Sequence, residues 1–234
     1  MMALVFDIET VGEDWGALDE TTRDVLTRWI RKESRDEGEY EAGLEDLKNG
    51  LGFSPLTGFI VAIGALDTES GKGAVYYCAP GAKPKEAQER GIKLKPLEEK
   101  EMLEQFWKVA ASVNEFVSFN GRSFDAPFLA LRSLVHGVRP TKDLLSNRYL
   151  SLQRGCAHID LQDQLTFYGA MRKRPSLHLF CRALGIESPK SDGVKGDDVA
   201  ALYKAGEYER IARYNAGDLF ATAALYERWK ETLR

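Results

Sequence analysis

The chain has 234 residues, of which 44% are hydrophobic, and this is enough to bury one sizeable core. It carries 32 Lys and Arg against 36 Asp and Glu, a net charge of -4, which excludes the strongly charged, weakly hydrophobic composition of disordered proteins. No segment approaches the roughly 18 uncharged apolar residues that a membrane span needs, and acids interrupt the apolar run near the N-terminus. We therefore expect a cytoplasmic protein that contacts no membrane.

The three cysteines, Cys78, Cys156 and Cys181, are widely spaced and form no C-x-x-C pair. This pattern favours reduced thiols in a core over disulfides or a zinc site.

Charge is distributed unevenly along the chain. Residues 12–50 hold twelve acids and six bases, whereas residues 121–190 hold five acids and eleven bases. A segment with excess positive charge is typical of surfaces that bind the phosphates of nucleic acids. Solvated Arg and Lys side chains on helices explain the same count equally well.

The first half of the chain predicts strands interrupted by a helical insertion. Residues 3–8 are apolar and predict a buried strand, in which the period of two places Asp7 and Glu9 on one face. Residues 14–50 are acidic, with apolar residues at helical intervals, and predict a helix-rich lid or excursion. The runs 58–68 and 73–79 predict a hairpin, because a glycine-containing segment separates them.

The second half predicts mostly helices. We interpret the Lys-rich residues 84–96 as a connector, with Pro96 starting a helix. A strand at 115–119 leads through a short turn into a helix at 124–137. A short strand at 157–160 and helices over 160–169, 176–184, 197–204 and 207–232 complete the chain. No repeat or linker divides it, so we expect a single α/β domain over residues 1–234 with an insertion at about 14–50.

Four acids are candidates for chemistry: Asp7 and Glu9 on a strand, Asp125 at a helix start, and Asp218 on the last helix, one turn after Tyr214. Hard divalent cations such as Mg²⁺ and Mn²⁺ prefer oxygen ligands. Two such ions can clamp the attacking and leaving oxygens of a phosphoryl displacement. Spacing alone leaves open whether the four acids converge.

Three segments carry a resemblance to a known family. FDIET at 6–10, SFNGRSFDAPFL at 118–129 and YNAGD at 214–218 resemble, in this order, the three motifs of the DEDD (DnaQ-like) 3′-to-5′ exonucleases. The Tyr-x-x-x-Asp form is similar to the DEDDy branch. The N-G-x-x-F-D form resembles the proofreading domain of family-B DNA polymerases and the stand-alone predicted exonucleases related to it. The resemblance implies an α/β, ribonuclease H-like fold with a mixed central β-sheet flanked by helices.

The resemblance also implies a role for each motif residue. Asp7, Glu9 and Asp218 would bind one divalent metal ion, and Asp7 with a water-mediated Asp125 would hold a second, the ions being Mg²⁺ or Mn²⁺. Tyr214 would orient or polarise the attacking water.

A histidine takes the place of this tyrosine in the DEDDh branch. His136, His158 and His178 lie outside the motif position. We therefore expect them to be ordinary core or surface residues.

Further residues are candidates for substrate binding. Thr10, Asn120 and Phe124 lie in the motifs, and a phenylalanine can stack on a base, although Asn120 and Phe124 fit a turn and a core equally well. The adjacent cations Arg172, Lys173 and Arg174 are expected to contact phosphates or to be merely solvated. The loop at 190–196 either guides a strand or is an ordinary loop, and Asp160 is expected to be structural.

The expected function is hydrolysis of the terminal phosphodiester bonds of single-stranded DNA, by two metal ions, with release of nucleoside monophosphates. An exoribonuclease is the main alternative, because no reader of the 2′-hydroxyl can be identified. A non-catalytic nucleic-acid-binding adaptor is a second alternative, against which the intact four acids and tyrosine count. A third is assembly through Trp15 and Trp29 in the insertion, which is compatible with catalysis.

Overall fold

A computed structural model describes residues 2–82, 86–188 and 196–234, and it has an α/β architecture built on one mixed sheet. The strands are β1 (Leu4–Gly12), β2 (Gly58–Asp67), β3 (Gly73–Tyr77), β4 (Ala87–Glu89), β5 (Ile92–Pro96), β6 (Glu115–Ser118) and β7 (Ala157–Asp160). Their order in the sheet is β4-β5-β3-β2-β1-β6-β7. β1 is therefore central, with β2 antiparallel on one side and β6 parallel on the other.

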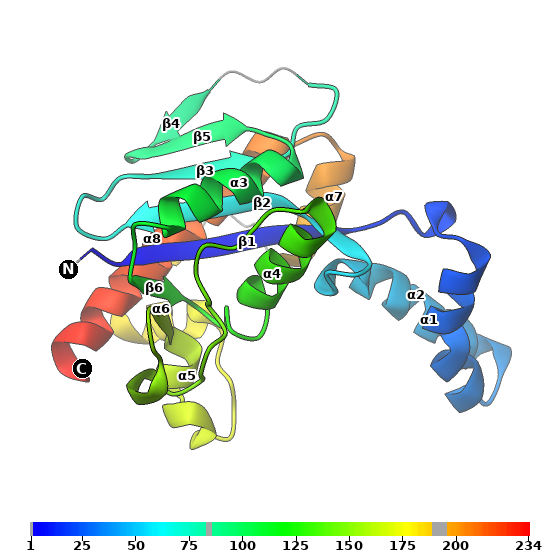
Figure 1. Ribbon diagram of the computed structural model, residues 1–234. Coiled ribbons are helices and arrows are strands. Elements are labelled where there is room, and N and C mark those ends of the chain that lie inside the picture. The colour runs from blue at the N-terminus through cyan, green and yellow to red at the C-terminus, as the bar shows by residue number, and fades with distance from the viewer. Residues whose placement is uncertain (1, 83–85, 189–195) are drawn as a thin grey trace.

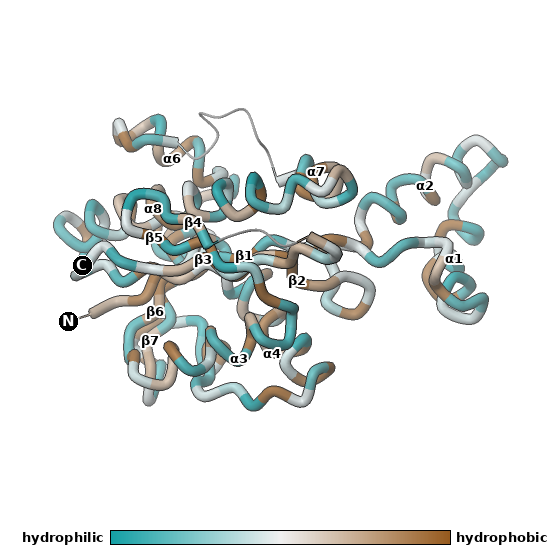
Figure 2. Tube along the Cα trace, turned by 90° about the horizontal axis from the view of Figure 1, so that it is seen from above, coloured by the Kyte–Doolittle hydropathy of each residue, from teal (hydrophilic) through white to brown (hydrophobic). Residues whose placement is uncertain are grey.

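Helices cover both faces of this sheet. The α-helices of the described residues are α1 (Glu20–Glu33), α2 (Glu37–Gly50), α3 (Glu99–Ala110), α4 (Asp125–His136), α5 (Leu161–Leu165), α6 (Leu177–Leu184), α7 (Val199–Lys204) and α8 (Tyr208–Thr232). In Figure 2, α3 and α4 lie on one side of the strands, and α6, α7 and α8 lie on the other. The predicted mixed sheet flanked by helices is thus confirmed.

The core fills both interfaces between the sheet and the helices. Strand β1 contributes apolar side chains to both layers, and Leu4, Val5, Phe6 and Ile8 are all buried. Cys78, Cys156 and Cys181 are all free and buried, as expected. None of the described helices is long and apolar enough to span a membrane.

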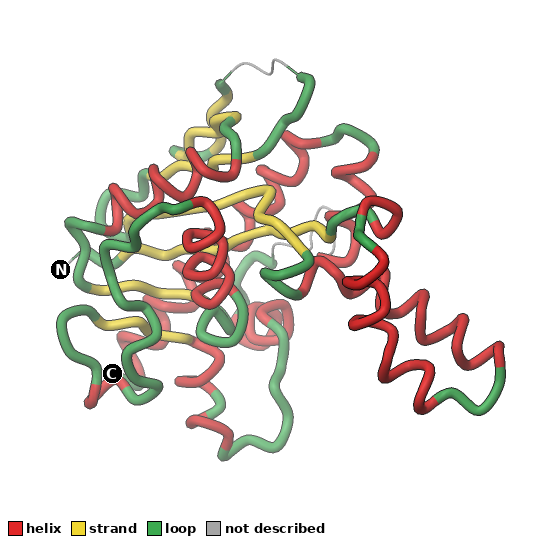
Figure 3. Tube along the Cα trace, turned by 45° about the vertical axis from the view of Figure 1, so that its right-hand side comes forward, coloured by secondary structure: helices red, strands yellow, loops and turns green. Residues whose placement is uncertain are grey.

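The segment between β1 and β2 forms a two-helix arm. Helices α1 and α2 project away from the sheet as an antiparallel pair, which is clearest in Figure 3. They pack closely, since a Cβ on Gly43 would lie only 2.8 Å from Ile30 Cγ2. The helical character expected for residues 14–50 is therefore confirmed, and we call residues 13–50 the arm.

Two local predictions are wrong. Residues 84–96 include β4 and β5 rather than a plain connector, because β5 pairs in parallel with β3 and extends the sheet. The next helix begins at Glu99, after a capping box between Glu98 and Glu101, and not at Pro96.

The helix expected over 160–169 is also interrupted. The α5 helix ends at Leu165, because Phe167 and Tyr168 adopt left-handed backbone angles. A short 3-10 turn at Phe167–Gly169 follows it.

Candidate active site

Three of the predicted acids form one compact carboxylate cluster. Asp7 and Glu9 extend from the same face of β1, and Asp218 extends from α8, which packs over that face. One ligand oxygen of each residue lies within 4.8 Å of the other two. Glu9 is buried and the other two are half-buried. The cluster can therefore offer three oxygen ligands to a hard cation, as the sequence predicted for these residues.

The cluster depends on the close approach of α8 to the sheet. Gly64 on β2 lies directly opposite Asp7, and a Cβ at Gly64 would fall 2.1 Å from Oδ1 of Asn215 and 2.7 Å from Leu219 Cδ1. Only glycine leaves room for the helix here. The fully buried Asn215 then donates from Nδ2 to Asp7 Oδ2 at 2.8 Å.

Sequence reasoning did not single out Asn215, although it lies inside the YNAGD motif. The available signal was a polar residue on the apolar stripe of α8, where a buried amide needs a partner. Its Oδ1 has no hydrogen-bond partner among the described residues. Asn215 is thus a structural support for Asp7.

Asp125 approaches the cluster from the other side of the sheet. The parallel pairing of β1 with β6 covers Leu4 and Val5 and ends there, so the N–H of Ile8 is left for another acceptor. Oδ1 of Asp125, the first residue of α4, accepts it at 2.9 Å. Asp125 is buried and its charge acts on Asp7 and Glu9, but it lies outside the group of three ligand atoms.

The acids disfavour one another's ionisation. Burial and the charges of the neighbouring carboxylates raise the pKa of Asp7 and of Glu9 well above their usual values. Burial raises the pKa of Asp125 to about 7, against the opposing effect of the Ile8 N–H bond. A bound divalent cation would offset this crowding of negative charge, which is the observation that fits the cluster to a metal.

Tyr214 lies one turn before Asp218 on α8, as predicted, and is half-buried. Burial raises the pKa of its phenol, and so do the charges of Asp218, Glu9 and Asp7. The phenol therefore stays protonated at neutral pH. It can donate a hydrogen bond to a water or phosphate oxygen, but it cannot act as a strong base.

A β-bulge shapes the strand next to the cluster. The register of β1 and β2 shifts between Glu9 and Thr10, which leaves Val61 as the extra residue. Oε1 of Glu99, at the start of α3, accepts the N–H of Ile60 at 2.8 Å beside this bulge. Arg132 of α4 binds both oxygens of Glu99 at 2.8 Å.

Two of the substrate candidates, Thr10 and Phe124, each stand next to one of the acids in the sequence. Oγ1 of Thr10 donates to the carbonyl of Gly52 at 2.7 Å, so this hydroxyl is directed to the base of the arm. The half-buried ring of Phe124, immediately before Asp125, lies 5.1 Å from the ring of Phe128.

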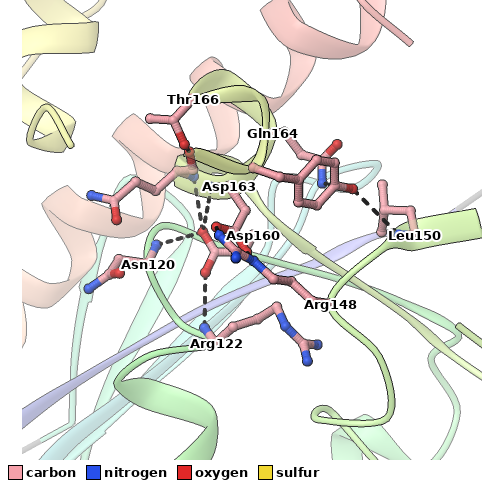
Figure 4. Close-up of polar contacts among 10 residues, drawn as sticks. Asn120, Arg122, Arg148, Leu150, Asp160, Asp163, Gln164 and Thr166 are labelled. Carbon is pink, nitrogen blue, oxygen red and sulfur yellow. Dashed lines mark hydrogen bonds and ion pairs between the residues drawn. The ribbon is translucent and has the colours of Figure 1, made fainter. Parts of the chain in front are cut away.

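Asn120 is held in a tight turn by Asp160. Figure 4 shows Asp160 accepting the backbone N–H groups of Asn120 at 2.9 Å and Arg122 at 3.0 Å. Asn120 has a positive φ of 64°, which asparagine tolerates better than most residues. The prediction of a structural role for Asp160 is confirmed, because it fixes the backbone of the second motif.

The remaining predicted residues are less closely connected to the cluster. Arg172, Lys173 and Arg174 are exposed, and within the described ranges no hydrogen bond or ion pair holds their side chains. Residues 190–195 of the loop expected to guide a strand lie outside the described residues.

Each histidine has a partner away from the acids, as expected. His136 Nε2 lies 2.7 Å from Glu99 Oε2, and His178 Nδ1 lies 2.7 Å from Ser188 Oγ. His158 is buried between Ser118 Oγ and the Leu144 carbonyl, each at 2.8 Å.

A mixed sheet with acids converging on its central strand defines an α/β protein of the ribonuclease H-like class. The architecture is similar to that of the family B DNA polymerase from the hyperthermophilic archaeon Pyrobaculum calidifontis, with a TM-score of 0.58 and 18% identity. The match covers 98% of this chain and 24% of the polymerase, so the chain spans about a quarter of that protein. At this identity the likeness is one of fold.

The family of this chain is identified from residue 82 onward, a range that contains the later residues of the site. Residues 82–233 match the family described as predicted 3′-5′ exonucleases related to the exonuclease domain of PolB, and the chain belongs to this family. The matched range includes Asp125, Tyr214 and Asp218. Asp7 and Glu9 precede it and join the site through the fold.

Proposed function

We propose that this protein is a DEDDy-type 3′-5′ exonuclease that hydrolyses the terminal phosphodiester bonds of single-stranded DNA and releases nucleoside monophosphates. The observation that carries the proposal is the convergence of Asp7, Glu9 and Asp218 within 4.8 Å. Membership of the exonuclease family supports the reaction class. In this proposal residues 1–234 act as one domain, with the arm as an insertion.

The residues present fit a pair of divalent ions, Mg²⁺ or Mn²⁺. Asp7, Glu9 and Asp218 would hold one ion, and Asp7 with Asp125 through a water would hold the other. When bound, such ions lower the pKa of water and offset the charge of the phosphate in in-line displacement. Asn215 keeps Asp7 oriented for this task through its 2.8 Å bond.

Tyr214 supplies a hydrogen-bond donor beside the acids. Because burial and the surrounding charges raise the pKa of its phenol, the proton stays on the tyrosine oxygen. In the proposed reaction this phenol orients the attacking water toward the phosphorus, and the carboxylates hold the metal ions.

Single strands are the favoured substrate because aromatic and polar groups flank the acids. Phe124 lies next to Asp125 and can stack on the terminal base, while Asn120 can hydrogen-bond a base or sugar. Arg172, Lys173 and Arg174 are exposed cations suited to the phosphates of the strand.

The test is digestion of a 5′-labelled single-stranded DNA oligonucleotide in Mg²⁺, Mn²⁺ or EDTA, with matched RNA and blunt-duplex DNA. Wild type should give a ladder that shortens one nucleotide at a time from the 3′ end and that EDTA abolishes. Asp7→Ala should remove the activity, and Tyr214→Phe should reduce it by about 10²- to 10⁴-fold.

Asp46→Ala and Tyr149→Phe are the matched controls, because both residues are exposed and neither contacts the acids. They should cut as wild type does. Faster digestion of RNA than of DNA would replace the substrate in the proposal. Binding of a single strand without cutting in either metal would overturn the catalytic proposal and leave the adaptor.

A further inference from the structure

The turn between the arm and β2 presents an exposed aromatic ring beside the candidate active site. Phe53 ends the short 3-10 turn η2 (Leu51–Phe53), and it is 67% exposed. Phe53 lies outside the range that matches the exonuclease family, so family membership assigns it no role.

Phe53 contacts the second motif directly. Its ring centroid lies 6.5 Å from that of Phe124, with the planes at 63°. Phe124 in turn precedes Asp125, whose charge acts on the carboxylate cluster. Aromatic side chains therefore continue outward from Asp125, from the half-buried Phe124 to the exposed Phe53.

The turn that carries Phe53 is fixed to the strand that carries the acids. Oγ1 of Thr10, the residue after Glu9, donates to the Gly52 carbonyl at 2.7 Å. Gly52 packs against Gly12 so closely that a Cβ on Gly52 would lie 2.9 Å from the Gly12 nitrogen. Behind Phe53, the buried Leu51 anchors the turn in the core.

Hydrogen bonds close the same turn on its other side. Thr57 Oγ1 donates to the Leu51 carbonyl at 2.8 Å, and the Gly58 N–H donates to the Ser54 carbonyl at 2.8 Å. An exposed ring on so constrained a backbone loses little conformational freedom when it binds a flat partner. Stacking on a nucleobase uses this property, and it tolerates any base because each has a π face.

We propose that the ring of Phe53 stacks on the nucleobase next to the 3′-terminal one. The turn between the arm and β2 then completes the binding site for a single strand. The 63° between the rings excludes a parallel sandwich of one base between Phe53 and Phe124, so the two rings take successive bases. This inference rests on the proposed function, because it places Phe124 at the terminal nucleotide.

The test measures binding and turnover of the full chain with 5′-fluorescein-labelled single-stranded DNA. Binding is measured by fluorescence anisotropy with Ca²⁺ in place of Mg²⁺, and a gel verifies that the strand stays intact. Kinetics are then measured in Mg²⁺ or Mn²⁺. The variants are Phe53→Ala, Phe53→Tyr and, as the control, Trp29→Ala, which removes an exposed aromatic side chain from the arm instead of from the turn.

Phe53→Ala should raise Kd and KM by about 5- to 100-fold, the range for loss of one base-stacking contact, and leave kcat within about twofold. Phe53→Tyr should restore binding, and Trp29→Ala should bind as wild type does. For the wild type, an abasic site second from the 3′ end of the strand should raise Kd by this same factor. For Phe53→Ala, the same abasic site should raise Kd no further.

An unchanged Kd in Phe53→Ala, or an equal abasic penalty in wild type and variant, would overturn the inference while the exonuclease proposal stands. Failure of the wild type to bind or cut any single strand would instead overturn the proposed function itself. Because Phe53 is exposed, the variant should fold, and its urea midpoint is the check.

Discussion

Asp125→Asn should stabilise the metal-free protein while impairing its function. Asp125 is buried, and burial raises its pKa from 3.8 to about 7. The carboxylate is therefore harder to ionise in the folded protein than in the unfolded chain. The asparagine side chain removes that ionisation and keeps an oxygen that can accept the Ile8 N–H.

Proton linkage gives the sign and the size of this change in the free energy of unfolding. Between about pH 4 and pH 7 the folded protein binds more protons at Asp125 than the unfolded chain, so the free energy of unfolding falls as the pH rises through this window. Above pH 7 the full effect of such a pKa difference is about 4 kcal/mol, an upper value because the neighbouring acids share it. We expect Asp125→Asn to gain about 2 kcal/mol or more at pH 8 and at most about 1 kcal/mol at pH 4.5.

The assay is urea denaturation at the two pH values in EDTA, repeated with Mn²⁺. The control is Asp46→Asn on α2, an exposed acid whose replacement should change stability by less than about 0.5 kcal/mol at either pH. Added Mn²⁺ should stabilise wild type, by about 2.7 kcal/mol at a hundred times Kd, and stabilise the variant less. A variant that is less stable than wild type at pH 8, or a gain that is the same at both pH values, would refute the reasoning.

Three further changes test the supports of the site. Gly64→Ala should cost about 1–3 kcal/mol in urea denaturation, because its Cβ would lie 2.1 Å from Asn215 Oδ1, and it should also weaken Mn²⁺ binding in calorimetry. Arg132→Met should cost about 3–5 kcal/mol, because it leaves the buried Glu99 carboxylate without its guanidinium partner. Replacing both residues with apolar side chains should cost less in the same assay. Burial lowers the pKa of His158 to about 4, so the unfolded chain takes up the proton first as the pH falls. Wild type should therefore lose about 3 kcal/mol of unfolding free energy between pH 6.5 and about 4, and His158→Gln should remove this loss in urea denaturation.

The sequence predicts which acids lie in pairs, but it does not predict the residues that bring the pairs together. Asp7 and Glu9 follow from the period of two in a strand, and Tyr214 and Asp218 follow from the helical period, so local geometry was sufficient to pair them. That the two pairs meet depends on how closely α8 approaches β2, which Gly64 decides. No local pattern reports that approach, because the residues involved are far apart in the chain.

The fold shows the same division. The long apolar runs of β1 and β2 and the periodic helices were predictable because their patterns are strong over many residues. Strands β4 and β5 were not predicted, since both are short, β5 carries two lysines and the pair lies at the edge of the sheet. The pairing of β5 with β3, and of β4 with β5, is a tertiary effect that overrides weak strand propensity.

The two faces of the sheet have opposite electrostatic characters, and the contrast explains how a strained cluster can persist. On the α8 face, burial and mutual repulsion raise the pKa of Asp7 and Glu9, so ionised acids there destabilise the metal-free fold. On the α3 and α4 face, hydrogen bonds from Arg132 and the Ile60 N–H lower the pKa of Glu99 despite its burial. Glu99 therefore stays charged and hydrogen-bonded at neutral pH. Its bond to the Ile60 N–H holds β2 beside the bulge, where the register of β1 and β2 shifts after Glu9. A rigid, satisfied network behind the strand is what allows the acids in front of it to remain crowded and ready for a cation.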